Sequence, residues 1–217
     1  MKTHLVLIML IISGFITAIA QTSEEKTDVI PEDQILQTGN SMFSPVATIQ
    51  QQGIENNSIF IQTPQDPGFN EAIIQQSGIH NNGYIQQTGA DLSSHLLQQG
   101  QNNEANLWSE GGHIDIDARQ TGSDNVIYSY IKNPGIFEKQ AILHQDGNNN
   151  RIELALFGNV MPTADQLVTI IQQGDDFEAK ALMESYNYSI GITQKEGPGG
   201  GDMKVDVSVS DFSFPMR

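Results

Sequence analysis

The sequence predicts an all-β protein folded as a β-solenoid of about seven stacked strand–turn–strand rungs. Three observations lead to this fold class. The motif Gln-x-Gly-x-x-Asn recurs along most of the chain, and apolar and polar residues alternate on both sides of it. The differences in repeat length fall in short segments rich in Pro, Gly and Asp. Stacked copies can bury an apolar face that one strand–turn–strand unit cannot bury alone.

The N-terminal residues have the composition of a signal peptide. Lys2 and His4 form a short basic region, residues 5–12 are apolar, and Ala18 and Ala20 occupy a small-x-small cleavage site. An uncleaved membrane anchor is the alternative, but the apolar run is short beside the about 20 residues of a membrane span. We therefore expect residues 1–20 to be removed and the protein to be secreted, with no direct insertion into a membrane.

The charge of the chain limits its partners. The sequence has 26 acidic and 10 basic residues and a net charge of −16, which becomes −17 when Lys2 leaves with the signal peptide. Nucleic acids and anionic membranes both attract basic patches, so neither is an expected partner. The chain has no cysteine, which excludes thiol catalysis, cysteine zinc sites and iron–sulfur clusters.

An acidic segment separates the signal peptide from the repeats. Residues 21–44 are polar, and Gln37-Thr38-Gly39-Asn40 resembles half of the repeat motif. We expect this segment to be a flexible leader with a partial rung.

The repeat region is expected over residues 45–196. Glycine and asparagine both tolerate positive φ, so Gly-x-x-Asn predicts a tight inner turn between two strands. The complete copies contain Gln51, Gly53 and Asn56; Gln76, Gly78 and Asn81; Gln98, Gly100 and Asn103; Gln120, Gly122 and Asn125; and Gln145, Gly147 and Asn150. A sixth copy has Gln172 and Gly174 but Phe177 in place of Asn. A degenerate seventh has Gln194 but Glu196 in place of Gly.

The residues before each Gln indicate a strand with one buried face. Two positions before the Gln stand Ile49, Ile74, Leu96, Ala118, Leu143, Ile170 and Ile192, whereas the residue after the Gln is polar in every copy. Stacking brings equal positions into register about 4.8 Å apart, so buried Gln and Asn side chains can hydrogen-bond along the stack. Such a ladder removes the cost of an unpaired buried amide group, which is about 1–3 kcal/mol. A disordered Gln/Asn-rich segment is the alternative, and the fixed columns disfavour it.

The second strand of each rung follows the inner turn. A second Gln stands eleven residues after the first in two copies, at Gln62 and Gln87, and later copies have Ser109, Ile131, Leu156 and Met183 there. Residues 176–187 contain helix formers, so a local helix is an alternative in that segment.

The C-terminal residues 197–217 are expected to be a Gly-rich loop and an amphipathic strand. Met203, Val205, Val207 and Val209 alternate with polar residues. This strand is either the second arm of the last rung or a terminal cap.

The repeat resembles that of the curlins, the subunits of bacterial curli fibres. The matching positions are the first Gln, the Gly, the Asn and the second Gln, and the match is closest in the rungs of Gln51 and Gln76. The resemblance implies a β-solenoid subunit that leaves the cell through an outer-membrane secretion pore. It also implies assembly, with a nucleator or paralogous subunit, into adhesive biofilm fibres. The opening Ser of the curlin repeat is mostly absent and the second Gln is lost after two rungs, so the chain resembles a divergent member.

No constellation of residues predicts an enzyme. The four histidines after the signal peptide occupy different repeat positions, so we expect them at the surface. Asp115 and Asp117 are expected on the outward face of their strand as solvated charges. Trp108 is the only tryptophan, which argues against an aromatic carbohydrate-binding strip. We expect no catalytic residue, no cofactor and no metal site.

These observations favour a secreted structural subunit of a curli-like extracellular amyloid fibre, self-assembled for adhesion and biofilm matrix. The alternative is a monomeric secreted β-solenoid that acts as an adhesin or ligand-binding module. A surface hydrolase would need carboxylates on one face of adjacent rungs, which the repeat columns do not predict. Fibre subunits need open end rungs and monomers need polar caps, so the ends of the stack discriminate between the first two functions.

Overall fold

The computed structural model describes residues 19–22, 32–37, 46–62, 69–133, 137–158, 165–183, 189–197 and 202–208. Within these ranges the chain forms β-strands and no helices, and all paired strands run parallel. The predicted all-β class and β-solenoid are therefore confirmed.

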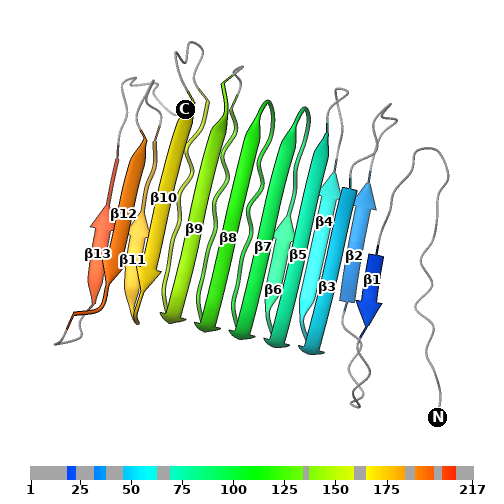
Figure 1. Ribbon diagram of the computed structural model, residues 1–217, viewed down its shortest axis with the longest axis horizontal. Coiled ribbons are helices and arrows are strands. Elements are labelled where there is room, and N and C mark those ends of the chain that lie inside the picture. The colour runs from blue at the N-terminus through cyan, green and yellow to red at the C-terminus, as the bar shows by residue number, and fades with distance from the viewer. Residues whose placement is uncertain are drawn as a thin grey trace, which may run out of the picture.

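The first arms of the rungs form one sheet of eight strands (Figure 1). Their spatial order is β1 (Ile19–Thr22), β3 (Val46–Ile54), β5 (Asn70–Ile79), β7 (Leu92–Gln101), β8 (Ile114–Ser123), β9 (Lys139–Asn148), β10 (Gln166–Gln173) and β12 (Ile190–Lys195). Spatial order follows sequence order, so each rung lies between its predecessor and its successor in the chain. This arrangement lets identical residues of successive repeats meet.

The second arms are less regular than the first. Strands β2 (Glu32–Gln37), β4 (Asn57–Gln62) and β6 (Asn82–Ile85) form one sheet, and β11 (Phe177–Lys180) pairs with β13 (Met203–Asp206). Between these sheets the described backbone of the second arms pairs through isolated bridges, such as Glu104 with Val126. There the φ angles are positive over 107–110, 129–133 and 154–157, which removes the backbone from the β region.

The number of rungs is the part of the fold that was not confirmed. The solenoid has about five turns, which is also the number of complete copies of the motif. The outermost strands at both ends belong to repeats in which the Gly or the Asn of the motif is missing. The turn after Gln172 keeps Gly174 and the positive φ at Asp176, whereas the repeat of Gln194 has no glycine at the corresponding position.

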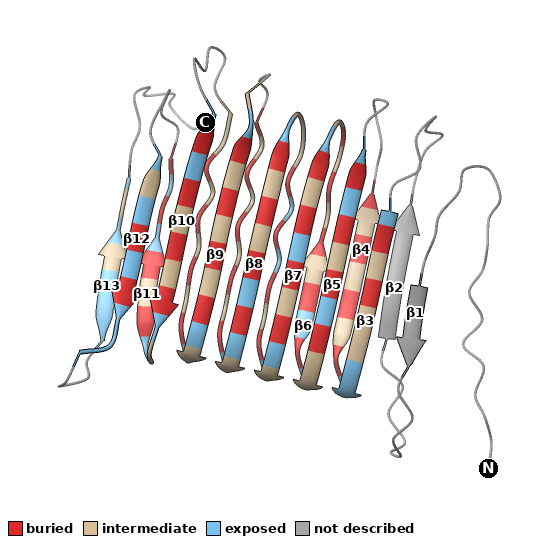
Figure 2. Cartoon of the chain, viewed as in Figure 1, coloured by how far each residue is buried: buried red, intermediate tan, exposed pale blue. Residues whose placement is uncertain are grey.

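Neighbouring first arms pair with equal motif positions opposite each other. Between β7 and β8, for example, Gln98 lies opposite Gln120 and Gly100 opposite Gly122. Buried residues alternate with less buried ones along the first arms, for example in β7 and β8 (Figure 2). Every second residue of these strands therefore faces the core between the two arms. The core there is continuous and includes Ile74, Ile85, Leu96, Leu107, Ile116, Ile127, Leu143, Ile152 and Ile170.

The inner turn explains why glycine recurs in the motif. Gly100 has a φ of +120°, and a Cβ there would lie 2.0 Å from the carbonyl oxygen of Gly122. Gly53, Gly78, Gly122 and Gly147 have the same clash with the next rung, at 1.9 to 2.1 Å. Two residues later the chain takes a left-handed conformation, with φ from 53° to 60° at Glu55, His80, Asn102, Asp124, Asn149 and Asp176. Glycine thus permits both the turn and the close stacking of rungs.

The alternative of a local helix over 176–187 is wrong where the structure describes that segment. Phe177–Lys180 is strand β11, with Phe177 and Ala179 buried in alternation with outward-facing neighbours. Its helix propensity is overridden because backbone pairing with β13 and core burial both require a strand. Residues 184–188 lie outside the described residues, as does Val209.

The segments before the repeats also pair with the stack. Gln37 lies opposite Gln62, so it occupies the second Gln position rather than the first, and Gly39 and Asn40 lie outside the described residues. Strand β1 spans the expected cleavage point after Ala20 and pairs with Thr48–Gln51 of β3. The rest of the expected signal peptide, residues 1–18, lies outside the described residues.

Replacement of Gly100 by Ala should destabilise the fold by about 3 kcal/mol or more, because the Cβ meets a backbone carbonyl and φ is positive. Gly111→Ala is the matched control, since its nearest atom is 3.8 Å away. Urea unfolding of both variants measures the difference. Equal stability of the two variants would show that the rungs are not held this closely.

Candidate functional site: the amide ladders and the ends of the stack

A ladder of glutamine side chains runs through the stack. Each Nε2 donates to the Oε1 of the next rung. The distances are 2.7 Å for Gln51 to Gln76, 2.6 Å for Gln76 to Gln98, 2.8 Å for Gln98 to Gln120, 3.0 Å for Gln120 to Gln145, 2.9 Å for Gln145 to Gln172 and 2.8 Å for Gln172 to Gln194. All donors point toward the C-terminal end, so the ladder has a direction.

The same glutamines also connect the two arms. Gln98 Nε2 lies 3.1 Å from the carbonyl oxygen of Asn82 and 3.0 Å from that of Asn103. Gln120, Gln145, Gln172 and Gln194 reach second-arm carbonyls at 2.9 to 3.1 Å in the same way. Each amide therefore crosslinks the stack in two directions, along its axis and across the core.

A second ladder of asparagines closes the inner turns. Asn103 Nδ2 donates to Asn81 Oδ1 at 2.9 Å and to the carbonyl oxygen of Gly122 at 3.0 Å. Asn56, Asn81, Asn125 and Asn150 make equivalent bonds to the backbone of the next turn. The ladder ends at Phe177, whose backbone N–H still donates to Asn150 Oδ1 at 3.0 Å.

The second glutamine column forms no comparable ladder in the described residues. Gln62 and Gln87 are fully buried, and Gln62 Nε2 donates to the carbonyl oxygen of Thr88 at 2.6 Å. The Gln87 amide is buried without a hydrogen-bond partner. The next residues in this column, Ser109 and Ile131, cannot continue an amide ladder, so Gln87 has no amide on its C-terminal side.

The two ends of the glutamine ladder are incomplete in opposite ways. At the N-terminal end, Gln51 Oε1 is buried and has no donor. At the C-terminal end, Gln194 Nε2 contacts the carbonyl oxygens of Glu178 at 3.0 Å and Met203 at 2.7 Å. No further glutamine follows it in the described residues. The first glutamine of the ladder thus lacks a donor for its Oε1, and the last one lacks the Gln Oε1 contact that the internal glutamines make.

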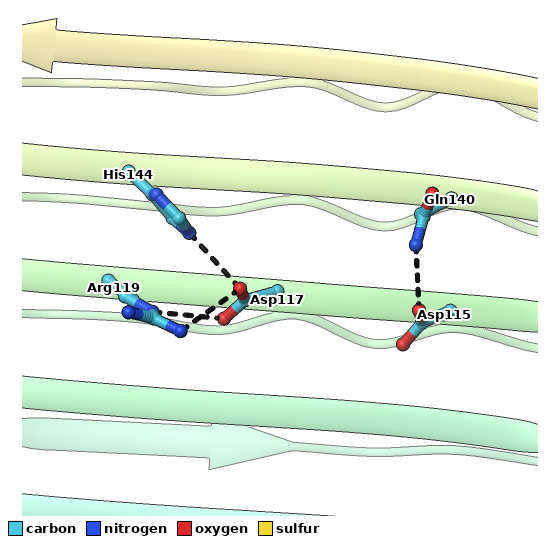
Figure 3. Close-up of polar contacts among 5 residues, drawn as sticks. All are labelled: Asp115, Asp117, Arg119, Gln140 and His144. Atoms are coloured by element: carbon cyan, nitrogen blue, oxygen red, sulfur yellow. Dashed lines mark hydrogen bonds and ion pairs between the residues drawn. The ribbon is translucent and has the colours of Figure 1, made fainter.

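The outward face of the first arms has paired polar side chains (Figure 3). Asp117 Oδ2 lies 3.2 Å from His144 Nε2 on the next rung, and Arg119 contacts Asp117 at 3.4 Å. Asp115 accepts a 2.9 Å hydrogen bond from Gln140. Both aspartates face outward as expected, but they are joined to the next rung rather than fully solvated. The contacts of Asp117 with His144 and of Asp115 with Gln140 join neighbouring rungs.

Carboxylates from adjacent rungs do gather at the outer turns, which the sequence reasoning missed. A shallow cleft of about 530 Å³ is lined by Asp91, Ser93, His113, Ile114, Asp115, Glu138 and Asp165. The sequence does contain a signal for this cleft. The position seven residues before the motif Gln is occupied by Asp91, His113, Glu138 and Asp165 in four successive repeats. Asp91 and Asp165 accept backbone N–H bonds from Phe69 and Glu138, at 3.0 Å each. These carboxylates are therefore engaged in fastening the outer turns.

No metal site emerges from these acidic groups. Among the described residues, no group of three or more His, Asp and Glu side chains is arranged to hold a metal ion. His80 pairs with Glu55 and His113 with Asp91, the latter at 3.4 Å, so each histidine contacts a carboxylate of the preceding rung. Both pairs are half exposed and so contribute little to stability.

Aromatic side chains also stack on the outward side of the second arms. The Trp108 and Tyr130 ring centroids are 4.7 Å apart, and those of Tyr130 and Phe157 are 5.6 Å apart. Burial and the neighbouring Glu110 carboxylate raise the pKa of Tyr130, whose hydroxyl donates to Glu110. Trp108 and Tyr130 share the position ten residues after the motif Gln, a column that the sequence reasoning did not compare.

One buried charge interrupts the apolar core. Lys139 follows Leu92 and Ile114 in the same inward column, and its Nζ lies 2.5 Å from Gln166 Oε1. Burial lowers the pKa of Lys139. The charged form is thus disfavoured in the folded state.

A comparison of the chain with models of protein families, with curated proteins and with solved structures found no match. Within the described residues there is also no helix that is long and apolar enough to cross a membrane.

Replacement of Gln98 by Ala should cost about 1–3 kcal/mol of stability, because Gln120 Oε1 loses its donor inside the core. The control Gln101→Ala removes an exposed side chain from the same strand and should change stability by less than about 0.5 kcal/mol. Denaturant unfolding compares the two. Similar losses for both variants would remove the ladder as a source of stability.

Lys139→Met should raise stability by roughly 1 kcal/mol at pH 7, because it removes a buried charge from an apolar column. In the wild type the unfolded state binds more protons between the lowered folded pKa and 10.5, so stability should rise with pH across that window. The Lys139→Met variant should lack this rise, whereas the exposed Lys195→Met should keep it. Thermal unfolding as a function of pH provides the measurement. The same pH dependence of stability in the wild type and in Lys139→Met would contradict a destabilising buried charge.

Proposed function

We propose that the protein is a secreted structural subunit of a curli-like extracellular amyloid fibre on a bacterial surface, with a role in adhesion and biofilm matrix. Subunits stack end to end and continue the glutamine ladder from one molecule to the next. Counted with the incomplete repeats of Gln172 and Gln194, each subunit contributes seven rungs to the fibre. The proposed partners are further copies of the chain, a nucleating or paralogous subunit and an outer-membrane secretion pore.

The complementarity of the two ladder ends is the observation that carries this proposal. An internal glutamine such as Gln98 has two second-arm carbonyls and one Gln Oε1 as acceptors. Gln194 has the two carbonyls but no Oε1, and Gln51 Oε1 has no donor. Head-to-tail contact supplies each end with what it lacks. Because the two surfaces differ, the contact does not close on itself and generates an open filament.

The other columns support the same register. Continued stacking places Ile190 next to Ala47 and Ile192 next to Ile49, which is apolar against apolar. On the second arm, the column that begins at Asn57 ends at Lys204. Asn57 Oδ1 is a buried acceptor without a donor, and Lys204 carries an exposed ammonium group. The contact between two subunits, or joint, would therefore bring a donor to an unsatisfied acceptor on both arms, Gln194 to Gln51 Oε1 and Lys204 to Asn57 Oδ1.

The net charge sets the conditions for assembly. Like charges repel at low ionic strength, so a mature chain with a net charge of −17 resists stacking until salt screens the repulsion or acid neutralises it. Fibre growth should therefore accelerate with salt and as the pH falls toward the isoelectric point of about 4.4.

The mature chain from Gln21 should form thioflavin-T-positive fibres when seeded at moderate salt, with a strand spacing of about 4.8 Å in fibre diffraction. Gln194→Glu removes the ladder donor at the joint and should slow elongation strongly. Gln173→Glu makes the same charge change at an exposed position of β10 and should leave elongation near the wild-type rate.

A wild-type chain that stays monomeric under all these conditions, even with seeds, would refute the fibre. The monomeric secreted adhesin would then be the better function. Equal elongation of the two Glu variants would refute the glutamine joint while leaving assembly itself in place.

A further inference from the structure

The two ends of the apolar core differ in exposure. At the N-terminal end, Ala47 and Ile49 are each 2% exposed and Phe60 is 1% exposed, although they belong to the first complete rung. At the C-terminal end, Ile190, Val205 and Val207 are only partly buried, and Met203 is 37% exposed. The N-terminal end is therefore covered, and the C-terminal end is open.

Strands β1 and β2 are placed to provide this cover. β1 pairs with β3 over four residues, from Thr48 to Gln51, and β2 pairs with β4 over six residues, from Asn57 to Gln62 (Figure 1). Both strands run parallel to the rung below them, as an internal rung does. They occupy the positions that a preceding rung, or the last rung of a second molecule, would occupy.

The cover does not continue the ladders. Gln51 Oε1 and Asn57 Oδ1 are buried beneath it without a donor. A buried acceptor without a donor destabilises the state that contains it. A rung that carries Gln194 and Lys204 would supply donors at both positions. Exchange of the cover for a second copy therefore gains hydrogen bonds that the covered monomer lacks.

We propose that the segment formed by β1 and β2 is a removable cap, which keeps the N-terminal docking surface closed until the C-terminal end of a second copy displaces it. This inference rests on the proposed fibre function and adds its regulation. Signal-peptide cleavage after Ala20 would remove half of β1 and leave β2 as the main part of the cap. The C-terminal end needs no such release, so uncapping limits the rate at which a subunit joins.

The composition of the cap fits a strand that blocks addition. β2 carries Glu32 and Asp33 opposite Asn57 and Ser58. Charged residues on an edge strand oppose the addition of a further strand, because the incoming chain must bury or approach the charges. A capped chain is thus protected from premature stacking during transit, and the cap still leaves by strand exchange without any covalent step.

The test compares three mature chains with identical wild-type seeds: the chain from Gln21, a chain from Val46 without the cap, and a double variant Gln34→Pro, Ile35→Pro. Consecutive residues of a strand direct their N–H groups to opposite sides, so the double variant removes at least one β2–β4 hydrogen bond without shortening the chain. Lys26→Pro with Thr27→Pro, between β1 and β2, is the matched control.

Loss of the cap should raise the seeded elongation rate several-fold in both the truncated chain and the Gln34/Ile35 variant, and the control should keep the wild-type rate. Hydrogen exchange of the wild-type monomer should show faster exchange in β3 and β4 than in β7 and β8, because the cap opens. Seeded growth of the wild type with an unchanged elongation rate in both cap variants would overturn the cap and leave the fibre intact. Absence of growth in every chain, seeds included, would instead overturn the fibre function.

Discussion

A carboxamide buried between two strands needs partners that only its neighbours along the stack can provide. Gln98 accepts a hydrogen bond from Gln76, donates one to Gln120 and reaches the second arm through the carbonyl of Asn82. Each rung is therefore stabilised by the rung before it and the rung after it. The same dependence makes the two end rungs incomplete, and this incompleteness is the physical basis of both the proposed joint and the proposed cap.

The ladder in turn depends on register, which the inner turn maintains. Gly100 approaches the carbonyl oxygen of Gly122 so closely that no side chain fits, and Asn103 bonds to the same carbonyl. The stack weakens where these residues are replaced. At Phe177 the backbone half of the asparagine ladder survives, because it needs only an N–H group. At Glu196 the glycine column ends.

Residues that face outward are released from these constraints and carry most of the variation between rungs. Asp117 with His144, Asp115 with Gln140, and Trp108 with Tyr130 all join one rung to the next. They differ in chemistry but share the distance that stacking imposes. At the outer turns, Asp91 and Asp165 likewise accept hydrogen bonds from backbone N–H groups of adjacent rungs.

The sequence by itself determined the solenoid, the positions that stack and the residues of the two main ladders, because periodicity reports which side chains share a column. It did not determine how many rungs are complete or where the second arm is a regular strand. The irregular second arms depend on positive backbone φ values over 107–110, 129–133 and 154–157, which no propensity encodes. Residues 177–180 illustrate the limit, since helix formers became strand β11 through pairing with β13. Only the tertiary structure showed which side chains from different rungs lie side by side, as at Asp91 and Glu138. It also showed which end of the core is covered. Both depend on how the chain winds in space, which the repeat pattern does not specify.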